Sequence, residues 1–207
     1  MSKCIAVKIG MKQSKIKIAV TGGIGSGKST VCKIINSLGY PVYSCDEVYK
    51  LVLQDGKTVQ ELTVEFGKEI LNADGSLNRS ALSAIVFNDE GKLERLNKIT
   101  HPKIFEKLFK ISSNDEGVVF YEVPLLFEGG YEKLFDSVLV VLRDKKERID
   151  CVMSRDNLSE EEVVSRLNKQ YNYDINDFTK YYVIHNDGNI DDLMLKINKL
   201  LSIIANQ

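Results

Sequence analysis

Residues 16–30 read IKIAVTGGIGSGKST, and this stretch decides the fold. Ile16–Thr21 is predicted to be a buried strand that runs into a glycine-rich turn. A helix is predicted over residues 28–38, and Gly39 is expected to end it. The residues between strand and helix satisfy the pattern G-x-x-x-x-G-K-[ST], in the strand–loop–helix context that a phosphate-binding P-loop requires.

The P-loop residues predict a site for ATP with Mg²⁺. Glycines let successive backbone N–H groups converge on phosphate oxygens, and the following helix offers the positive end of its dipole. Lys28 is expected to reach the β- and γ-phosphates, and the Ser29 hydroxyl to bind Mg²⁺. A glycine-rich turn without any ligand is the less favoured alternative. The residues expected to contact the nucleotide are Gly23, Ile24, Gly25, Ser26, Gly27, Lys28, Ser29 and Thr30.

Further along the chain, short apolar runs alternate with helical patterns. With Ile16–Thr21, the runs at 42–45, 118–123, 137–142 and 181–184 predict a parallel sheet of five strands in a three-layer α/β kinase fold. The predicted organisation is an N-terminal extension over 1–15, a P-loop core over 16–46, 115–143 and 180–207, a helical acceptor domain over 47–114, and a lid over 144–179. Ser159 and Glu162 form a capping signature for a helix within the lid.

Composition excludes several classes of protein. The 28 basic and 29 acidic residues are mixed along the chain, so no basic stripe is available to bind nucleic acid. No apolar run approaches the ~20 residues of a membrane helix. Cys4, Cys32, Cys45 and Cys151 are irregularly spaced, which favours neither a zinc site nor a disulfide framework. The sequence therefore predicts a cytoplasmic protein that acts on a small molecule.

A P-loop alone does not separate kinases from other nucleotide-binding proteins. The chain has no Asn-Lys-x-Asp and no Asp-x-x-Gly, the patterns expected of a guanine-specific switch. Asp46 follows the second predicted strand, where the carboxyl ends of a parallel sheet gather ligands. A carboxylate there could accept the proton of an acceptor hydroxyl. Asp46 could equally be the N-cap of a helix over 47–53, and the sequence leaves both interpretations open.

With these features in place, the chain from residue 16 to about 203 resembles the dephospho-coenzyme A kinase family. The resemblance rests on the order and spacing of residues 21–30, Asp46, Asp74-Gly75 with Leu77, His101-Pro102, residues 124–128, Arg155-Asp156 with Leu158-Ser159, Arg166, Gln170 and Asn186. It implies ATP, Mg²⁺ and transfer of the γ-phosphate to the 3′-hydroxyl of dephospho-coenzyme A, with Asp46 as base. Residues 47–114 match the coenzyme A domain of that family. One departure is Ser44, where the family often has a second acidic residue.

Arginines of the predicted lid are candidates for the donor site. Arg148 and Arg155 are seven residues apart and share one helix face, and Arg166 lies on the next helix. Guanidinium groups there could stabilise charge on the transferred phosphoryl group or pack on adenine. The alternative is a solvated helix face. The resemblance favours Arg155, as a catalytic residue, and then Arg166 over Arg148.

Four further positions complete the candidate site. Glu122 ends the third strand, where a carboxylate can hold Mg²⁺ through water, although a surface carboxylate is an equal alternative. The resemblance places His101, Pro124 and Leu125 near the acceptor and Asn186 near adenine. The alternatives are a helix-start or core-facing histidine and an asparagine that only forms a turn.

Two other functions remain open from sequence. A nucleoside or nucleoside monophosphate kinase would share the cradle and the fold. A regulatory protein that hydrolyses ATP slowly and signals by its conformation belongs to a different class. The predicted acceptor is nevertheless dephospho-coenzyme A, on the strength of the resemblance.

Overall fold

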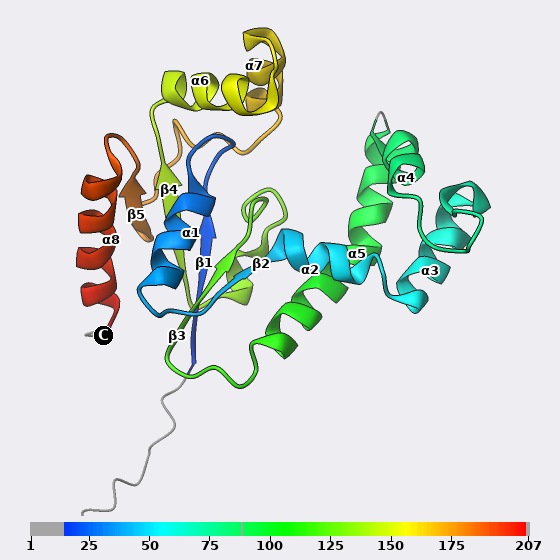
Figure 1. Ribbon diagram of the computed structural model, residues 1–207, viewed down its shortest axis with the longest axis horizontal. Helices are drawn as coiled ribbons and strands as arrows, with labels where there is room; N and C mark the ends of the chain where they lie inside the picture. Colours follow the sequence, from blue (N-terminus) through cyan, green and yellow to red (C-terminus); the bar gives the residue numbers. More distant parts are fainter. Residues whose placement is uncertain (1–14, 88, 206–207) are drawn as a thin grey trace, which may run out of the picture.

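The computed structural model describes residues 15–87 and 89–205, and its centre is a parallel sheet of five strands (Figure 1). The strands lie in the order β2-β3-β1-β4-β5, so β1, which leads into the P-loop, is central. The bounds are β1 (Ile16–Thr21), β2 (Val42–Ser44), β3 (Val118–Glu122), β4 (Ser137–Leu142) and β5 (Tyr182–His185). The predicted fold class and the number of strands are confirmed.

Alternate residues of the strands pack on opposite faces of the sheet, because side chains along a strand point to each face in turn. In β1, Ile18 and Val20 pack with α1 (Lys28–Ser37) and α8 (Ile190–Ala205), while Ala19 packs on the other face. That other face is covered by α5 (Glu90–Ile111), together with aromatic residues from the segment before β5. Both faces of β1 are thus buried, as the apolar strand pattern predicted.

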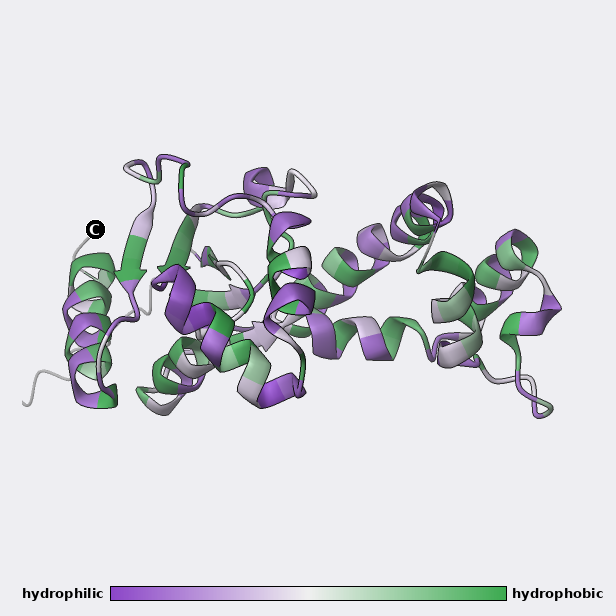
Figure 2. Ribbon diagram, turned by 90° about the horizontal axis from the view of Figure 1, so that it is seen from above, coloured by the Kyte–Doolittle hydropathy of each residue, from purple (hydrophilic) through white to green (hydrophobic). Residues whose placement is uncertain are grey.

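Between β2 and β3 the chain forms helices that extend away from the sheet (Figures 1 and 2). Asp55, Asn78 and Asp89 cap three of these helices, each by accepting a hydrogen bond from a backbone N–H of the first turn. The insert has a hydrophobic cluster of its own, formed by Leu53, Leu62, Phe66, Ile70, Leu82, Val86 and Leu96. Its elements are α2 (Cys45–Val52), α3 (Gly56–Phe66), η1 (Lys68–Ile70), α4 (Arg79–Val86) and α5.

The segment predicted as a lid contains two helices, α6 (Lys145–Asp156) and α7 (Glu160–Asn168). Asn157 between them has φ 53°, a left-handed conformation that ends α6. Ser159 caps α7, and its backbone N–H is in turn bonded by the Glu162 side chain. The predicted capping box is therefore present.

Several predicted boundaries are wrong by a residue, and one of these errors affects Asp46. Strand β2 ends at Ser44, and α2 begins at Cys45 with Ser44 as its N-cap residue. Asp46 therefore lies inside the first turn of α2, so its interpretation as an N-cap is wrong. Strand β3 ends at Glu122, one residue earlier than predicted, and β5 spans Tyr182–His185, one residue later than predicted at both ends.

Of the predicted N-terminal extension, only Lys15 belongs to the described residues, and residues 1–14 lie outside them. The Lys15 side chain donates hydrogen bonds to the backbone carbonyl and the hydroxyl of Ser112. Among the described helices, none combines the length and the apolar character needed to cross a membrane.

Candidate active site

The candidate residues come together at one edge of the sheet, where all five parallel strands end. β1 leads into the P-loop, β2 into Asp46, and β3 into Pro124 and Leu125. β4 leads to α6 of the lid, and β5 leads to Asn186. Ligands of open parallel sheets bind outside this carboxyl edge. The strand order therefore positions residues that are far apart in sequence around the same space.

The P-loop has the conformation that its glycines allow. Gly25 and Gly27 have φ angles of 78° and 87°, in the region that residues with a Cβ rarely adopt. A Cβ on Gly27 would lie 2.1 Å from the Asn186 amide nitrogen, so the close contact also requires glycine. Ser26 Oγ is buried and has no hydrogen-bond partner within the described residues. An unpaired donor at the base of such a loop fits a phosphate ligand.

Lys28 lies over this loop. Its ammonium group donates hydrogen bonds to the carbonyl oxygens of Gly22 at 2.6 Å and Gly23 at 3.0 Å. Burial lowers the pKa of Lys28 to about 8, and nearby acidic groups, with Glu122 foremost, oppose that shift. Near pH 8, about half of the Lys28 side chains are therefore neutral in the free protein. A bound phosphate would raise the pKa of Lys28 again, because an opposite charge favours the protonated form.

Ser29 and Glu122 form the candidate metal position. The Ser29 hydroxyl donates a hydrogen bond to Glu122 Oε1 at 2.8 Å, so Glu122 is not a free surface carboxylate. Residues 15–87 and 89–205 contain no cluster of three or more His, Cys, Asp or Glu that could hold a metal by itself. Mg²⁺ commonly takes one or two protein oxygens and completes its shell with phosphates and water. A hydroxyl beside a carboxylate fits that requirement.

The four residues predicted for the acceptor line one cavity of about 250 Å³: Asp46, His101, Pro124 and Leu125. Tyr49, Asn97 and Tyr131 also line it, and sequence reasoning missed all three. A wider groove of about 1,220 Å³ begins at Asp46 and Tyr49 and follows α2, α4 and α5 to the exposed Phe87. Lys169, from the segment predicted as a lid, borders that groove.

One of the two alternatives for His101, that it begins a helix, is wrong. His101 lies within α5, and Pro102 is an internal residue of the same helix. The ring is half-buried, and its Nδ1 is hydrogen-bonded to the Tyr131 hydroxyl. Burial lowers the pKa of His101, so the ring is neutral at physiological pH. No sequence signal pointed to Tyr131, because it lies 30 residues from His101, at the start of a short helix between β3 and β4.

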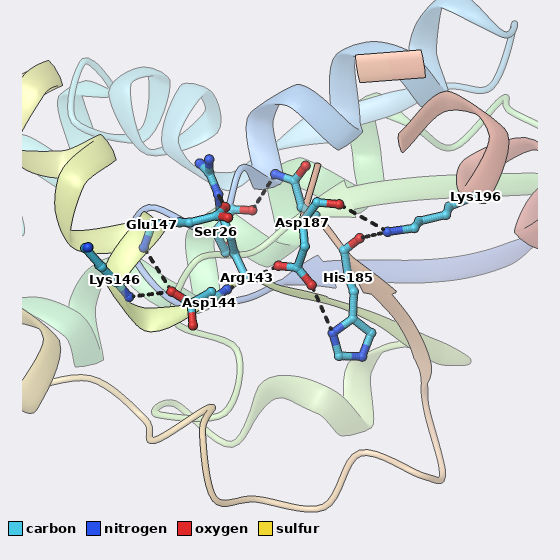
Figure 3. Close-up of polar contacts among 9 residues, drawn as sticks. Ser26, Arg143, Asp144, Lys146, Glu147, His185, Asp187 and Lys196 are labelled. Atoms are coloured by element: carbon cyan, nitrogen blue, oxygen red, sulfur yellow. Dashed lines mark hydrogen bonds and ion pairs between the residues drawn. The ribbon is translucent and has the colours of Figure 1, made fainter. Parts of the chain in front are cut away.

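On the other side of the P-loop, the chain after β5 contacts the cradle directly (Figure 3). The Asn186 amide donates to the carbonyl oxygen of Ser26 at 2.9 Å, so Asn186 does more than form a turn. Asp187 accepts a hydrogen bond from the backbone N–H of Asp144, where α6 begins. Lys196 of α8 donates to the carbonyl oxygen of His185 at 2.7 Å. These contacts join the end of β5 to the P-loop, to the start of α6 and to α8.

The three arginines of the segment predicted as a lid do not meet at one point. Arg155 makes two hydrogen bonds to Asp156, at 2.7 and 2.8 Å, and Arg166 lies 3.7 Å from the same carboxylate. Arg148 is instead buried against the P-loop, where its guanidinium would be 2.8 Å from a Cβ on Gly23. Its ion-pair partner is Asp174 at 3.5 Å, and its Nε is buried without a partner within the described residues. Arg148, the arginine least favoured from sequence, is thus nearest the cradle.

Residues of the segment after α7 contact the P-loop and the end of β1. Gln170 Oε1 accepts a hydrogen bond from the Ile24 backbone N–H at 2.8 Å. The hydroxyls of Tyr173 and Thr21 are 3.1 Å apart, and Tyr173 is buried. Glu128 accepts a hydrogen bond from the Tyr171 backbone N–H. Sequence reasoning included Gln170 only as part of the resemblance, and it gave no signal for Tyr173.

Comparison with known proteins agrees with this geometry. A protein-family model described as dephospho-CoA kinase matches residues 16–192. The dephospho-CoA kinase of Listeria monocytogenes is 36% identical over 179 residues, covering 84% of this chain and 90% of that protein. The dephospho-CoA kinase of Fusobacterium nucleatum is 35% identical over 189 residues, covering 90% of this chain and 97% of that protein.

Two solved structures share the fold of this chain, and one of them is named as a dephospho-CoA kinase. A structure from Thermus thermophilus superposes with a TM-score of 0.80 at 34% identity, covering 93% of this chain and 99% of that one. The dephospho-CoA kinase of Campylobacter jejuni has a TM-score of 0.66 at 30% identity, covering 93% of this chain and 98% of that one. The chain belongs to the dephospho-CoA kinase family.

Proposed function

We propose that this protein phosphorylates the ribose 3′-hydroxyl of dephospho-coenzyme A with ATP, giving coenzyme A and ADP in the last step of coenzyme A synthesis. Membership of the family supports the reaction. The structural observation that carries the proposal concerns Asp46. Asp46 lines the 250 Å³ cavity, and it is also one of the acidic groups near Lys28 that, after Glu122 and Glu128, oppose the lowering of the lysine pKa by burial. This position supports a role for Asp46 between the acceptor and the phosphates of ATP.

On the donor side, residues 23–30 bind the phosphates of ATP, with Lys28 on the β- and γ-phosphates. Ser29 and Glu122 would hold Mg²⁺, and the ion would supply neutralisation of charge on the phosphates. Arg155 acts in catalysis, and with Arg166 and Asn186 it binds the donor nucleotide, because guanidinium forks suit phosphate oxygens. The close contact of Asn186 with Ser26 supports its place beside the cradle. Residues 144–179 act as the lid.

On the acceptor side, Asp46 accepts the proton of the attacking hydroxyl, and His101, Pro124 and Leu125 bind the substrate around it. The groove of about 1,220 Å³ gives the rest of this long substrate a path along α2, α4 and α5. Its lining is mostly apolar, with Lys50, Arg79 and Lys169 at its borders. Residues 47–114 therefore act as the acceptor domain of a cytoplasmic enzyme.

Measuring ADP release with three sets of acceptors tests this function. Dephospho-coenzyme A should give rapid, saturable ADP release, whereas a panel of nucleosides and nucleoside monophosphates should give little. Mass spectrometry should show one added phosphate on the ribose of dephospho-coenzyme A. Preferential turnover of a nucleoside would support the nucleoside kinase alternative. ADP release that no acceptor changes would support the regulatory ATPase.

A further inference from the structure

The hydrogen bond between Tyr131 and His101 joins two parts of the chain at the acceptor cavity. His101 lies in α5, and Tyr131 begins the short helix η2 (Tyr131–Leu134). The two rings meet edge to face, with centroids 5.4 Å apart and an interplanar angle of 81°. Phe105, one turn after His101 in α5, packs against Tyr131 at 4.7 Å between ring centroids. Tyr131 is therefore held by packing as well as by its hydrogen bond.

We propose that Tyr131 is a positioning residue that donates its O–H to His101 Nδ1, so that Nε2 carries the N–H offered to the ribose hydroxyl beside the reacting one. In dephospho-coenzyme A that neighbouring group is the 2′-hydroxyl. The inference rests on the proposed function, because it assigns a role within the same acceptor site. Tyr131 acts through His101 and need not touch the substrate.

The direction of the hydrogen bond follows from what each group can donate. A neutral imidazole has one nitrogen that accepts and one that donates. Burial lowers the pKa of His101 and raises that of Tyr131, so both groups are neutral at physiological pH and the phenol keeps its proton. Within the described residues, the Tyr131 hydroxyl has no other hydrogen-bond acceptor. Donation from the phenol to Nδ1 therefore satisfies both groups and leaves the ring proton on Nε2.

The opposite ring nitrogen is available to a ligand. Nε2 has no hydrogen-bond partner in the described part of the chain. It is not one of the buried polar atoms without a partner, so it is accessible to a ligand. His101 and Asp46 line the same cavity. Besides the Tyr49 hydroxyl and the Asn97 amide, the cavity then offers a charged acceptor, the Asp46 carboxylate, and a donor, the His101 N–H. This pair matches two adjacent hydroxyls, of which one donates its proton to Asp46 and the other accepts from His101.

A comparison of dephospho-coenzyme A with its 2′-deoxy analogue tests the assignment. The parent protein should prefer dephospho-coenzyme A in kcat/KM by roughly five- to a hundredfold, the range expected when a buried donor is left unpaired. Tyr131→Phe should reduce that preference about twofold, because roughly half of the rings then present Nε2 without a proton. The KM for ATP should stay unchanged. Tyr43→Phe is the matched control, since its hydroxyl donates to Asp115 and Tyr43 does not line the acceptor cavity.

A glutamine at position 101 separates the tautomer from simple packing. In His101→Gln, the amide places an N–H near the position of Nε2 and has no tautomers. Whatever the preference of His101→Gln, adding Tyr131→Phe should not reduce it further. A further reduction of the same size in both backgrounds would mean that Tyr131 acts by packing alone, and the proposal would be wrong.

Nitrogen-15 NMR of the His101 ring gives a readout independent of turnover. The ring should show the Nε2–H tautomer in the parent and a mixture of tautomers in Tyr131→Phe. An unchanged tautomer together with an unchanged preference would overturn the inference. If the parent does not phosphorylate dephospho-coenzyme A at all, the proposed function fails, and the NMR experiment still decides whether Tyr131 sets the tautomer.

Discussion

Asp46 owes its position to the change from strand to helix just before it. β2 ends at Ser44, and α2 begins at once, so the Asp46 side chain projects from the first turn of a helix at the carboxyl edge of the sheet. Both Asp46 and Glu47 lie in this first turn, where acidic groups stabilise the helix through its dipole. Only Asp46 lines the acceptor cavity. The neighbouring glutamate is therefore a natural control for the dipole effect.

We expect Asp46→Asn to lower turnover with dephospho-coenzyme A by ~10²–10⁴-fold, because the amide cannot accept the hydroxyl proton. The melting temperature and the affinity for Mg·ATP should stay close to those of the parent. Glu47→Gln removes the same charge from the same turn and should keep nearly full turnover. Steady-state kinetics and thermal unfolding of both variants provide the test. Similar losses in the two variants would show that Asp46 acts only through the helix.

The lowered pKa of Lys28 predicts that nucleotide binding takes up a proton at alkaline pH. The free protein has a lysine pKa of about 8, and phosphates beside the ammonium group raise it. Above pH 8, the affinity for ATP should therefore fall as pH rises, with a slope approaching tenfold per unit. Below pH 8 the lysine is charged in both states, and the affinity should no longer depend on this group.

Calorimetric titration at pH 8.5, in buffers of different ionisation enthalpy, measures that proton directly. Lys28→Arg is the control, since a guanidinium stays charged throughout this range. It should bind nucleotide without proton uptake, even if its turnover is lower. Equal proton uptake by the two proteins would assign the proton to another group.

At the scale of elements, the segment proposed as a lid contacts the P-loop at some points and is exposed at others. The first turns of α6 pack on the cradle through the buried Arg148, whereas the last turn carries the exposed Arg155. The segment after α7 bonds to the P-loop through Gln170 and to the end of β1 through Tyr173. The P-loop is thus supported by Arg148 and Gln170, whereas Arg155 does not contribute to that support.

We expect Arg155→Ala to weaken ATP binding or slow phosphoryl transfer by roughly tenfold to a hundredfold, the range for a lost hydrogen bond to a charged group. The KM for dephospho-coenzyme A should change little, because Arg155 is assigned to the donor side. Lys145→Ala removes an exposed charge from the first turn of the same helix and should have little effect. A change confined to the acceptor KM would move Arg155 to the acceptor site.

At the scale of the whole molecule, the insert and the sheet have separate hydrophobic clusters. Leu62 is fully buried within the cluster of the insert, and Ile197 is fully buried between α8 and the sheet. The acceptor groove is lined almost wholly by the insert, whereas the cradle belongs to the sheet. Loosening the cluster of the insert should therefore weaken binding of dephospho-coenzyme A more than binding of ATP.

Leu62→Ala and Ile197→Ala each remove a buried aliphatic side chain, at a cost of ~2–5 kcal/mol in the free energy of unfolding. Leu62→Ala should raise the KM for dephospho-coenzyme A and speed hydrogen exchange in α2–α5, while the affinity for ATP stays near that of the parent. Ile197→Ala should lower overall stability without a selective effect on the acceptor. Exchange that rises equally throughout both proteins would show that insert and sheet unfold as one unit.

The sequence by itself determined the features that depend on neighbouring residues. Hydrophobic periodicity gave the five strands and the helical insert, the P-loop motif gave the cradle, and Ser159 with Glu162 gave the start of α7. These features are local, since a strand period, a helix cap or a glycine-rich turn is specified within a few residues. Family resemblance added which distant positions belong to the site.

Tertiary structure decided which of those residues meet, and how. Arg148 and Arg155 share a helix face, yet they stand roughly 10 Å apart along the axis, so only Arg148 reaches the P-loop. Tyr131 meets His101 across 30 residues, and Gln170 meets Ile24 across 146 residues. No local pattern specifies such pairs, because they depend on the path of the chain between them. Asp46 became a cavity residue rather than a helix cap for the same reason: the position of one strand end, fixed by pairing with β3, determined where α2 begins.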